Sequence, residues 1–185
     1  MGGMADPIPP LDPLLGLIAT LDHSGVACVL GGSGLLHALG LVDRVRDWDL
    51  QTDASEDEVR TALAGYETTH HGNDALHADS KFGVPVARAE VICRFAFYVP
   101  AGVVRLPVIV SGAWCAVPLA SLEVWAVAYA LLAAGERSPR RLARSERLFS
   151  RLAERGADPA AVRTLLAQPL PPPLAARLAA LPPRG

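Results

Sequence analysis

The sequence predicts an α+β (α/β) fold, in which helices flank a small mixed β-sheet and a helical tail follows it. An apolar run at residues 26–30 ends in a Gly-Gly-Ser turn and a short helical segment. Strand-like segments recur between residues 46 and 110, and only helical periodicity follows from residue 119. We therefore expect an αβ core over residues 1–115 and a C-terminal helical region, residues 116–185, packed on it.

Length and composition bound the class of protein. The chain has 185 residues, 51% of them hydrophobic, which is enough for one core of ordinary size. The net charge of −2 argues neither for nor against a nucleic-acid partner. We expect no signal peptide and no membrane span, and we expect all three cysteines to be buried and reduced, as in a cytoplasmic protein.

The first elements are predicted from apolar spacing and from turn residues. Apolar residues at helical spacing predict a helix over residues 11–23, with Asp12 as its N-cap. Residues 26–30 are continuously apolar, as in a strand that is buried on both faces. After Gly31-Gly32, Ser33 is expected to cap a second helix that Gly40 ends.

Residues 46–52 alternate and predict a strand with two different faces. Trp48 and Leu50 point one way, and the other face carries Asp47, Asp49 and Gln51. A helix is expected from residue 54 to about 63, with acidic residues in its first turn. Residues 66–70 are assigned to a short strand and the following stretch to a loop.

Residues 86–99 form the strongest strand pattern. Alternate apolar residues line one face, and Arg88, Glu90 and Arg94 lie on the other. Pro100-Ala101-Gly102 predicts a turn that returns as a strand over residues 103–110. The tail is expected to hold helices at residues 119–134, 139–155, 158–167 and 174–181, with the apolar stretch 122–132 in the core.

The Asp-Trp-Asp triplet places two carboxylates on one face of a strand. Their Cα atoms should lie roughly 6.6–7 Å apart, which suits oxygen ligation of two Mg²⁺ ions, with Mn²⁺ as a substitute. The alternative is a half-buried strand with a polar outer face, in which Arg44 or Arg46 neutralises the acids.

The Gly31-Gly32-Ser33 turn between a strand and a helix is compatible with phosphate binding. Backbone N–H groups and the serine hydroxyl would hold the anion. Tight turns require glycine in any case, so this turn alone is weak evidence. The sequence has neither the Gly-Lys-Ser/Thr of a P-loop nor the Rossmann glycine pattern.

In combination, these two motifs resemble the signature of the nucleotidyltransferase superfamily with the polymerase-β-like fold. A strand, Gly-Gly-Ser, thirteen residues and then Asp-hydrophobic-Asp-hydrophobic cover residues 26–53 closely. Minimal members include antibiotic nucleotidyltransferases and the toxins of abortive-infection systems. The resemblance implies that Gly31, Gly32 and Ser33 hold the β and γ phosphates of an NTP, and that Asp47 and Asp49 bind two metal ions.

The family draws a third acid from a later strand, and Glu90 matches that place. The family usually has Asp there, so the longer side chain is a departure. Arg88 and Arg94 flank Glu90 and, with Arg46, are predicted to contact the nucleotide phosphates. A surface row of salt bridges is the alternative for these residues.

Two further groups of residues are an arginine stripe and a set of histidines. A stripe of arginines on the second tail helix is either a solvated face or a wall that meets triphosphate or RNA: Arg140, Arg144, Arg147, Arg151 and Arg155. His70, His71 and His77 are expected in a solvated loop, and His37 as a packing residue.

Two functions follow as hypotheses. The first is a Mg²⁺-dependent nucleotidyltransferase that moves an NMP group from an NTP to an acceptor hydroxyl and releases pyrophosphate. Asp47, Asp49 and Glu90 would be its catalytic and metal-binding residues, and the acceptor would be a small molecule, a protein or an RNA. The second is an inactive nucleotidyltransferase-like binding or regulatory module of toxin–antitoxin type. A homodimer or a partner protein is left open in both.

Overall fold

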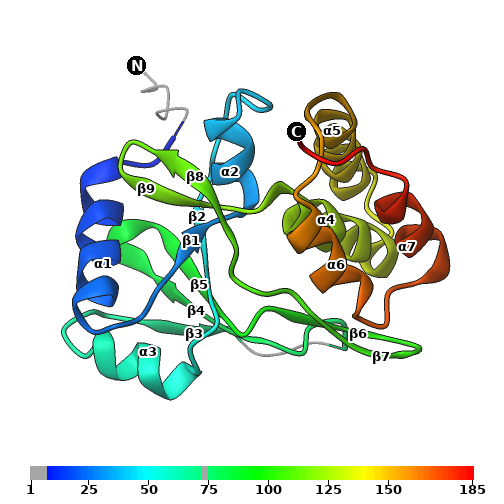
Figure 1. Ribbon diagram of the computed structural model, residues 1–185. Helices are drawn as coiled ribbons and strands as arrows, with labels where there is room; N and C mark the ends of the chain where they lie inside the picture. The colour runs from blue at the N-terminus through cyan, green and yellow to red at the C-terminus, as the bar shows by residue number, and fades with distance from the viewer. Residues whose placement is uncertain (1–7, 72–74) are drawn as a thin grey trace.

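The fold has a mixed β-sheet at its centre, with helices on both faces and a helical tail at one side (Figure 1). The computed structural model describes residues 8–71 and 75–185. The sheet has seven strands in the order β3-β4-β5-β2-β1-β9-β8. The pairs β2–β5 and β1–β9 are parallel, and the other neighbours are antiparallel. The α+β prediction with a small mixed sheet is confirmed.

The strands are short, and two of them form a separate hairpin. The sheet consists of β1 (Val29–Leu30), β2 (Trp48–Thr52), β3 (Thr69–His71), β4 (Ser80–Val84), β5 (Ala89–Cys93), β8 (Val110–Trp114) and β9 (Val117–Ala120). Strands β6 (Ala96–Val99) and β7 (Gly102–Arg105) pair only with each other. This hairpin extends beneath the tail in Figure 1.

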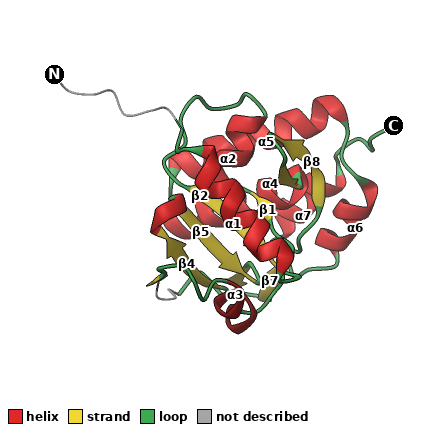
Figure 2. Ribbon diagram, turned by 90° about the vertical axis from the view of Figure 1, so that its left-hand side faces the viewer, coloured by secondary structure: helices red, strands yellow, loops and turns green. Residues whose placement is uncertain are grey.

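Helices cover the two faces of the sheet unequally. The N-terminal helix α1 (Leu11–His23) lies across one face, with α3 (Glu56–Ala62) at its lower end (Figures 1 and 2). The tail lies on the other side and holds α4 (Leu122–Glu136), α5 (Pro139–Arg155), α6 (Pro159–Leu166) and α7 (Pro172–Ala179). Helix α2 (Gly32–Ala38) follows β1 directly.

Several predicted elements agree with the structure in place and type. Helices α1 and α5 have the predicted bounds, and the hairpin turns at Pro100 and Ala101. The apolar stretch 122–132 is almost entirely buried in α4. His37 is partly buried and packs edge-on against Trp114, as expected.

The single strand predicted over residues 86–99 is wrong. The structure has a 3-10 turn (Pro85–Ala87), then β5, then β6, with breaks at Arg88 and Arg94. Both arginines have positive φ, 47° and 53°, so the chain changes direction at each one. Alternation of apolar residues continues across both breaks, and for that reason the pattern does not reveal them.

Four smaller predictions are corrected. Pro10, not Asp12, is the N-cap of α1, and Gly31, not Ser33, is the N-cap of α2. Residues 117–120, next to the predicted boundary at 115/116, are β9 of the central sheet, so the helical tail begins at Leu122 rather than at residue 119. Cys115 is exposed in the β8–β9 turn, whereas Cys28 and Cys93 are buried.

The polar face of β2 is covered rather than exposed. The Gln51 side chain is fully buried, where its Nε2 donates to the Leu106 carbonyl (2.7 Å) and its Oε1 accepts from Trp125 Nε1 (3.2 Å). This amide therefore joins the sheet, the chain after β7 and helix α4. The interpretation of β2 as a strand with a solvated outer face is wrong at this position. None of the described helices is long and apolar enough to cross a membrane.

Replacing Gln51 with leucine should destabilise the protein. The substitution leaves the buried Trp125 N–H and Leu106 carbonyl without partners, which costs about 2–4 kcal/mol of unfolding free energy. Urea denaturation is the measurement. Gln168→Leu is the matched control, because it removes one exposed hydrogen bond to the Arg105 amide and should cost less than about 1 kcal/mol. Equal stability of the two variants would contradict this assignment.

Candidate active site

A polar cleft of about 490 Å³ lies where the central sheet meets the start of α5. It contains five of the predicted site residues: Ser33, Arg46, Asp47, Asp49 and Glu90. The remaining lining residues come mostly from the tail: Arg44, Lys81, Glu136, Ser138, Arg140, Arg141 and Arg144. Six of the lining side chains are cationic and four are acidic, so the cleft suits a polyanion more than a neutral ligand.

Strand register brings the two central carboxylates together. In the parallel pair β2–β5, Asp49 lies directly opposite Glu90. Residues opposite each other on neighbouring strands share a face, with backbones about 4.8 Å apart. Asp47 immediately precedes β2, two residues before Asp49. Three acids separated by up to 43 positions in the sequence therefore reach one cleft.

The glycine pair allows the turn to lie against both Asp49 of the cleft and Trp125 of α4. A Cβ on Gly32 would lie 1.6 Å from Asp49 Oδ2, and its φ of +54° disfavours any other residue. A Cβ on Gly31 would lie 2.0 Å from the Trp125 ring. The Gly31 amide also donates to the Asp49 carbonyl (2.8 Å). The turn therefore sets where Asp49 and Ser33 lie relative to each other.

The Asp49 carboxyl has an unusually high affinity for its proton. Burial, followed by the negative charges of Glu90 and Asp47, raises its pKa to about 7. Arg141 and Lys81 oppose the shift but do not cancel it. This unfavourable clustering of acids in the cleft would be relieved by a cation.

Asp47 is held by its neighbour. Arg46 donates from Nε (3.2 Å) and Nη2 (3.1 Å) to Asp47 Oδ2, as the neutralisation alternative anticipated. The Arg46 side chain is 86% exposed, so this ion pair contributes little to stability and is easily exchanged.

The carboxylate oxygens of Asp47, Asp49 and Glu90 are the kind of ligand that Mg²⁺ prefers. As they stand, no three His, Cys, Asp or Glu side chains within residues 8–71 and 75–185 are close enough to hold a metal ion. The chemistry of the donors fits a hard divalent cation. Arg46 occupies only Oδ2 of Asp47, so Oδ1 is available to such a cation, and Oδ2 would become available once Arg46 leaves.

Two arginines of α5 are positioned by a buried tyrosine. Arg144 Nη1 donates to the Tyr129 hydroxyl (3.2 Å), and its guanidinium lies 5.4 Å from the centre of that ring. The Arg141 guanidinium lies 6.0 Å from the same ring, and its Nε donates to Glu136 (3.3 Å). Tyr129 is fully buried on α4, so it fixes both cations at the edge of the cleft.

Some predicted site residues lie elsewhere. Arg88 and Arg94 are not among the residues that line the cleft. Arg88 Nη2 donates to the Arg46 carbonyl (2.7 Å), and the Arg94 amide donates to the Thr52 carbonyl beyond the end of β5. His70 belongs to β3 and His77 is buried beside Phe97, which corrects their assignment to a solvated loop. His71 is in β3, and residues 72–74 of the predicted loop lie outside the described residues.

Sequence reasoning missed Lys81 and Arg141. Lys81 is the only lysine of the chain and lies on β4, a strand the pattern did not predict. Arg141 lies next to the predicted stripe in the sequence and shares the Tyr129 ring and the cleft with Arg144, a member of that stripe. Arg140, Arg141 and Arg144 all line the cleft, so the first turns of α5 face it. The interpretation of the stripe as a basic wall that meets triphosphate requires this position of Arg140 and Arg144.

The architecture is the fold of nucleotidyltransferases. Solved structures of that class match the chain with probability 1.00, with TM-scores of 0.50–0.52. No family model matches the sequence. No curated protein matches it either.

Two proteins represent the match. One is TM1012 of Thermotoga maritima, assigned as a nucleotidyltransferase: 19% identity, TM-score 0.52, 78% of this chain and 93% of that one. The other is the antibiotic-resistance factor ANT(2″)-Ia. Its crystal structure with adenylyl-2″-tobramycin has 15% identity, a TM-score of 0.52, and coverage of 92% and 97%. Its solution structure has 17% identity, a TM-score of 0.50, and coverage of 75% and 80%. At these identities the likeness establishes the fold.

The Asp49 pKa predicts how stability depends on pH. Its folded pKa of about 7 exceeds the unfolded value of 3.8, so its contribution to stability is fully present below pH 4 and is lost as the pH rises to 7. The unfolding free energy of Asp49→Asn, measured relative to the wild type, should therefore be higher at pH 8 than at pH 4 by roughly 2–4 kcal/mol. Urea denaturation of both proteins from pH 4 to 8, without divalent metal, measures this. A difference that does not change with pH would contradict the carboxylate cluster.

Proposed function

We propose that the protein transfers a nucleoside monophosphate from an NTP to an acceptor hydroxyl, with release of pyrophosphate. One observation carries the proposal: Asp49 and Glu90 face each other across parallel strands, in the same cleft as Ser33 and Asp47. The surrounding cations match a triphosphate in charge. The fold shared with nucleotidyltransferases supports the reaction class.

Ser33 and the Gly31-Gly32 turn would bind the end of the triphosphate that leaves. The first amides of a helix lack intrahelical partners, and Ser33 lies in the first turn of α2 within the cleft. Lys81, Arg141 and Arg144 would bind phosphate oxygens from the opposite side. The negative charge that develops on the departing pyrophosphate would then be met by groups already in position.

Asp47, Asp49 and Glu90 would hold two Mg²⁺ ions, which would neutralise triphosphate charge and lower the pKa of the attacking hydroxyl. On the protein side, the Glu90 carboxylate would accept the proton from that hydroxyl. Arg46 would release Asp47, since an exposed ion pair is cheap to break. The acceptor would approach along the open side of the cleft, in line with the α-phosphate.

The alternative is a binding module without turnover. It is favoured by one observation, namely that Arg46 holds Asp47 and no metal-binding triad is formed within the described residues. Such a protein would bind an NTP in the same cleft and leave it intact. The two functions therefore separate on pyrophosphate release, not on nucleotide binding.

Replacing both aspartates should abolish the reaction. Purified protein with Mg²⁺, each of the four NTPs and a panel of hydroxyl acceptors should release pyrophosphate from at least one NTP. Asp47→Asn with Asp49→Asn should reduce that rate at least about a hundredfold, because the groups that stabilise transferring charge are lost. An enzyme-coupled phosphate assay measures the rate.

The matched control is Asp12→Asn with Asp57→Asn, two exposed acids on α1 and α3. It removes the same charge outside the cleft and should retain wild-type turnover. Nucleotide binding is followed in parallel by calorimetry. Binding without pyrophosphate release from any combination would establish the inactive module. Failure to bind Mg²⁺ or any NTP at millimolar concentration would refute both functions.

A further inference from the structure

A second cationic hollow lies at the far end of α5 from the cleft. It has a volume of about 360 Å³ and is lined by residues of β8, β9, α4 and α5, by Leu39 just after α2, and by the C-terminal segment. Three guanidiniums line it: Arg151, Arg155 and Arg184. None of its described lining residues is acidic. It shares no lining residue with the catalytic cleft.

Two of these arginines form no ion pair within the part of the chain that the structure describes. Arg151 and Arg155 are one helical turn apart on α5, and no described residue forms an ion pair with either. Arg151 Nε is buried and has no hydrogen-bond partner among the described residues. Like charges at this spacing repel each other, and a buried N–H without an acceptor is costly. An oxyanion between the two guanidiniums would remove the repulsion between them.

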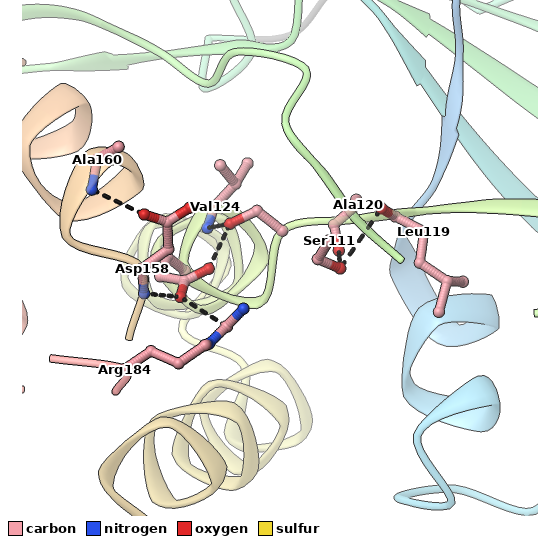
Figure 3. Close-up of polar contacts among 9 residues, drawn as sticks. Ser111, Leu119, Ala120, Val124, Asp158, Ala160 and Arg184 are labelled. Atoms are coloured by element: carbon pink, nitrogen blue, oxygen red, sulfur yellow. Dashed lines mark hydrogen bonds and ion pairs between the residues drawn. The ribbon is translucent and has the colours of Figure 1, made fainter. Parts of the chain in front are cut away.

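The third arginine is fixed by the C-terminal segment. The Arg184 amide donates to the Ala157 carbonyl (2.7 Å), and the Ala157 amide donates to the Pro182 carbonyl (2.7 Å). Arg184 Nη2 lies 3.6 Å from Glu123 Oε1. Figure 3 shows Arg184 extended beneath Asp158 toward this buried carboxylate. A residue distant in sequence is therefore held at the mouth of the hollow.

The nearby acids are already satisfied by other groups. Glu123 accepts from the Asp158 amide (2.8 Å) and from the Ser121 hydroxyl (2.5 Å), as well as facing Arg184. Asp158 Oδ1 accepts from the Ala160 amide at the start of α6 (2.8 Å; Figure 3). Glu154, the remaining acid beside the stripe, is exposed. The hollow keeps a net positive charge.

The rest of the wall is apolar, which limits the kind of ligand. Leu39, Leu119, Leu122 and Leu152 line the hollow. The Ser111 hydroxyl donates to the Ala120 carbonyl (2.7 Å; Figure 3), so the donors for a ligand are the guanidiniums. A phosphate group would meet the arginines, while a flat apolar group would lie on the leucines.

We propose that this hollow binds a phosphate monoester that carries a flat aromatic ring, of the nucleoside monophosphate class. The phosphate oxygens accept hydrogen bonds from the guanidiniums of Arg151 and Arg155, and the base packs on the leucine wall. The volume is at the lower end of the range for small-ligand pockets, about 300–1,000 Å³. The site is separate from the catalytic cleft, so it stands whether or not the protein is a nucleotidyltransferase.

The test uses adenosine 5′-monophosphate with the full chain, without Mg²⁺ and without any triphosphate. Backbone amide NMR should show saturable shifts at Ser111, Leu119 and Gly156. Shifts at Gly32 and Ser33 report the cleft separately. Arg151→Gln with Arg155→Gln should weaken the binding seen at the hollow at least tenfold. Arg105→Gln with Arg163→Gln, two exposed arginines outside both hollows, is the control and should bind as the wild type does.

The probes distinguish the sources of the phosphate. Adenosine should bind at least tenfold more weakly than the monophosphate, and inorganic phosphate should also bind more weakly. Equal affinity for inorganic phosphate would overturn the role of the leucine wall. A single-stranded RNA tetramer that binds where the monophosphate does not would overturn the small-ligand assignment. Shifts that persist in the double variant would refute the site. So would the absence of shifts in the wild type when the protein is at millimolar concentration and the monophosphate is at 10-fold that concentration.

Discussion

The absence of a side chain at Gly32 is the constraint on which the polar cleft depends. Asp49 Oδ2 occupies the place where a Cβ would be, at 1.6 Å, and Gly31 leaves equivalent room for the Trp125 ring. The turn that carries Ser33 therefore lies against both the acidic strand and the tail helix. A side chain at position 32 would overlap Asp49, and a gain in hydrogen bonding could not offset steric repulsion at this distance.

Helix α4 connects this constraint to the rest of the molecule. Its Trp125 reaches the turn and Gln51, its Tyr129 carries the cleft arginines, and its Glu123 holds the C-terminal segment. One face of the helix thus contacts the sheet, and its remaining faces contact α5 and α6. This explains why α4 is apolar nearly all round, as a helix must be when it is surrounded by protein.

Several helices, the strands β1 and β2 and the acidic core of the cleft were predictable because they depend on local patterns. Gly-Gly-Ser, Asp-Trp-Asp and the apolar spacing of α1 and α5 are each contained in a short segment. Glu90 was reached through the family resemblance, and strand register then places it opposite Asp49. Lys81 and Arg141 were missed because their position depends on how β4 and α5 pack, and packing leaves no periodic signal. Arg88 and Arg94 were assigned to the cleft because the alternating pattern concealed two left-handed residues.

The placement of Arg141 and Arg144 against Tyr129 has a consequence for ligand affinity. A guanidinium that is already confined by an aromatic ring loses little rotational freedom when it meets a phosphate. Immobilising such a long side chain otherwise costs about 0.5–1.5 kcal/mol for each residue. Folding of the tail has already restricted these side chains. The tilted ring contacts of Trp125 with Phe95 and Tyr129 join helix α4 to the segment between β5 and β6. The cleft is therefore preorganised for a polyanion, and an anionic ligand should bind with little accompanying domain closure.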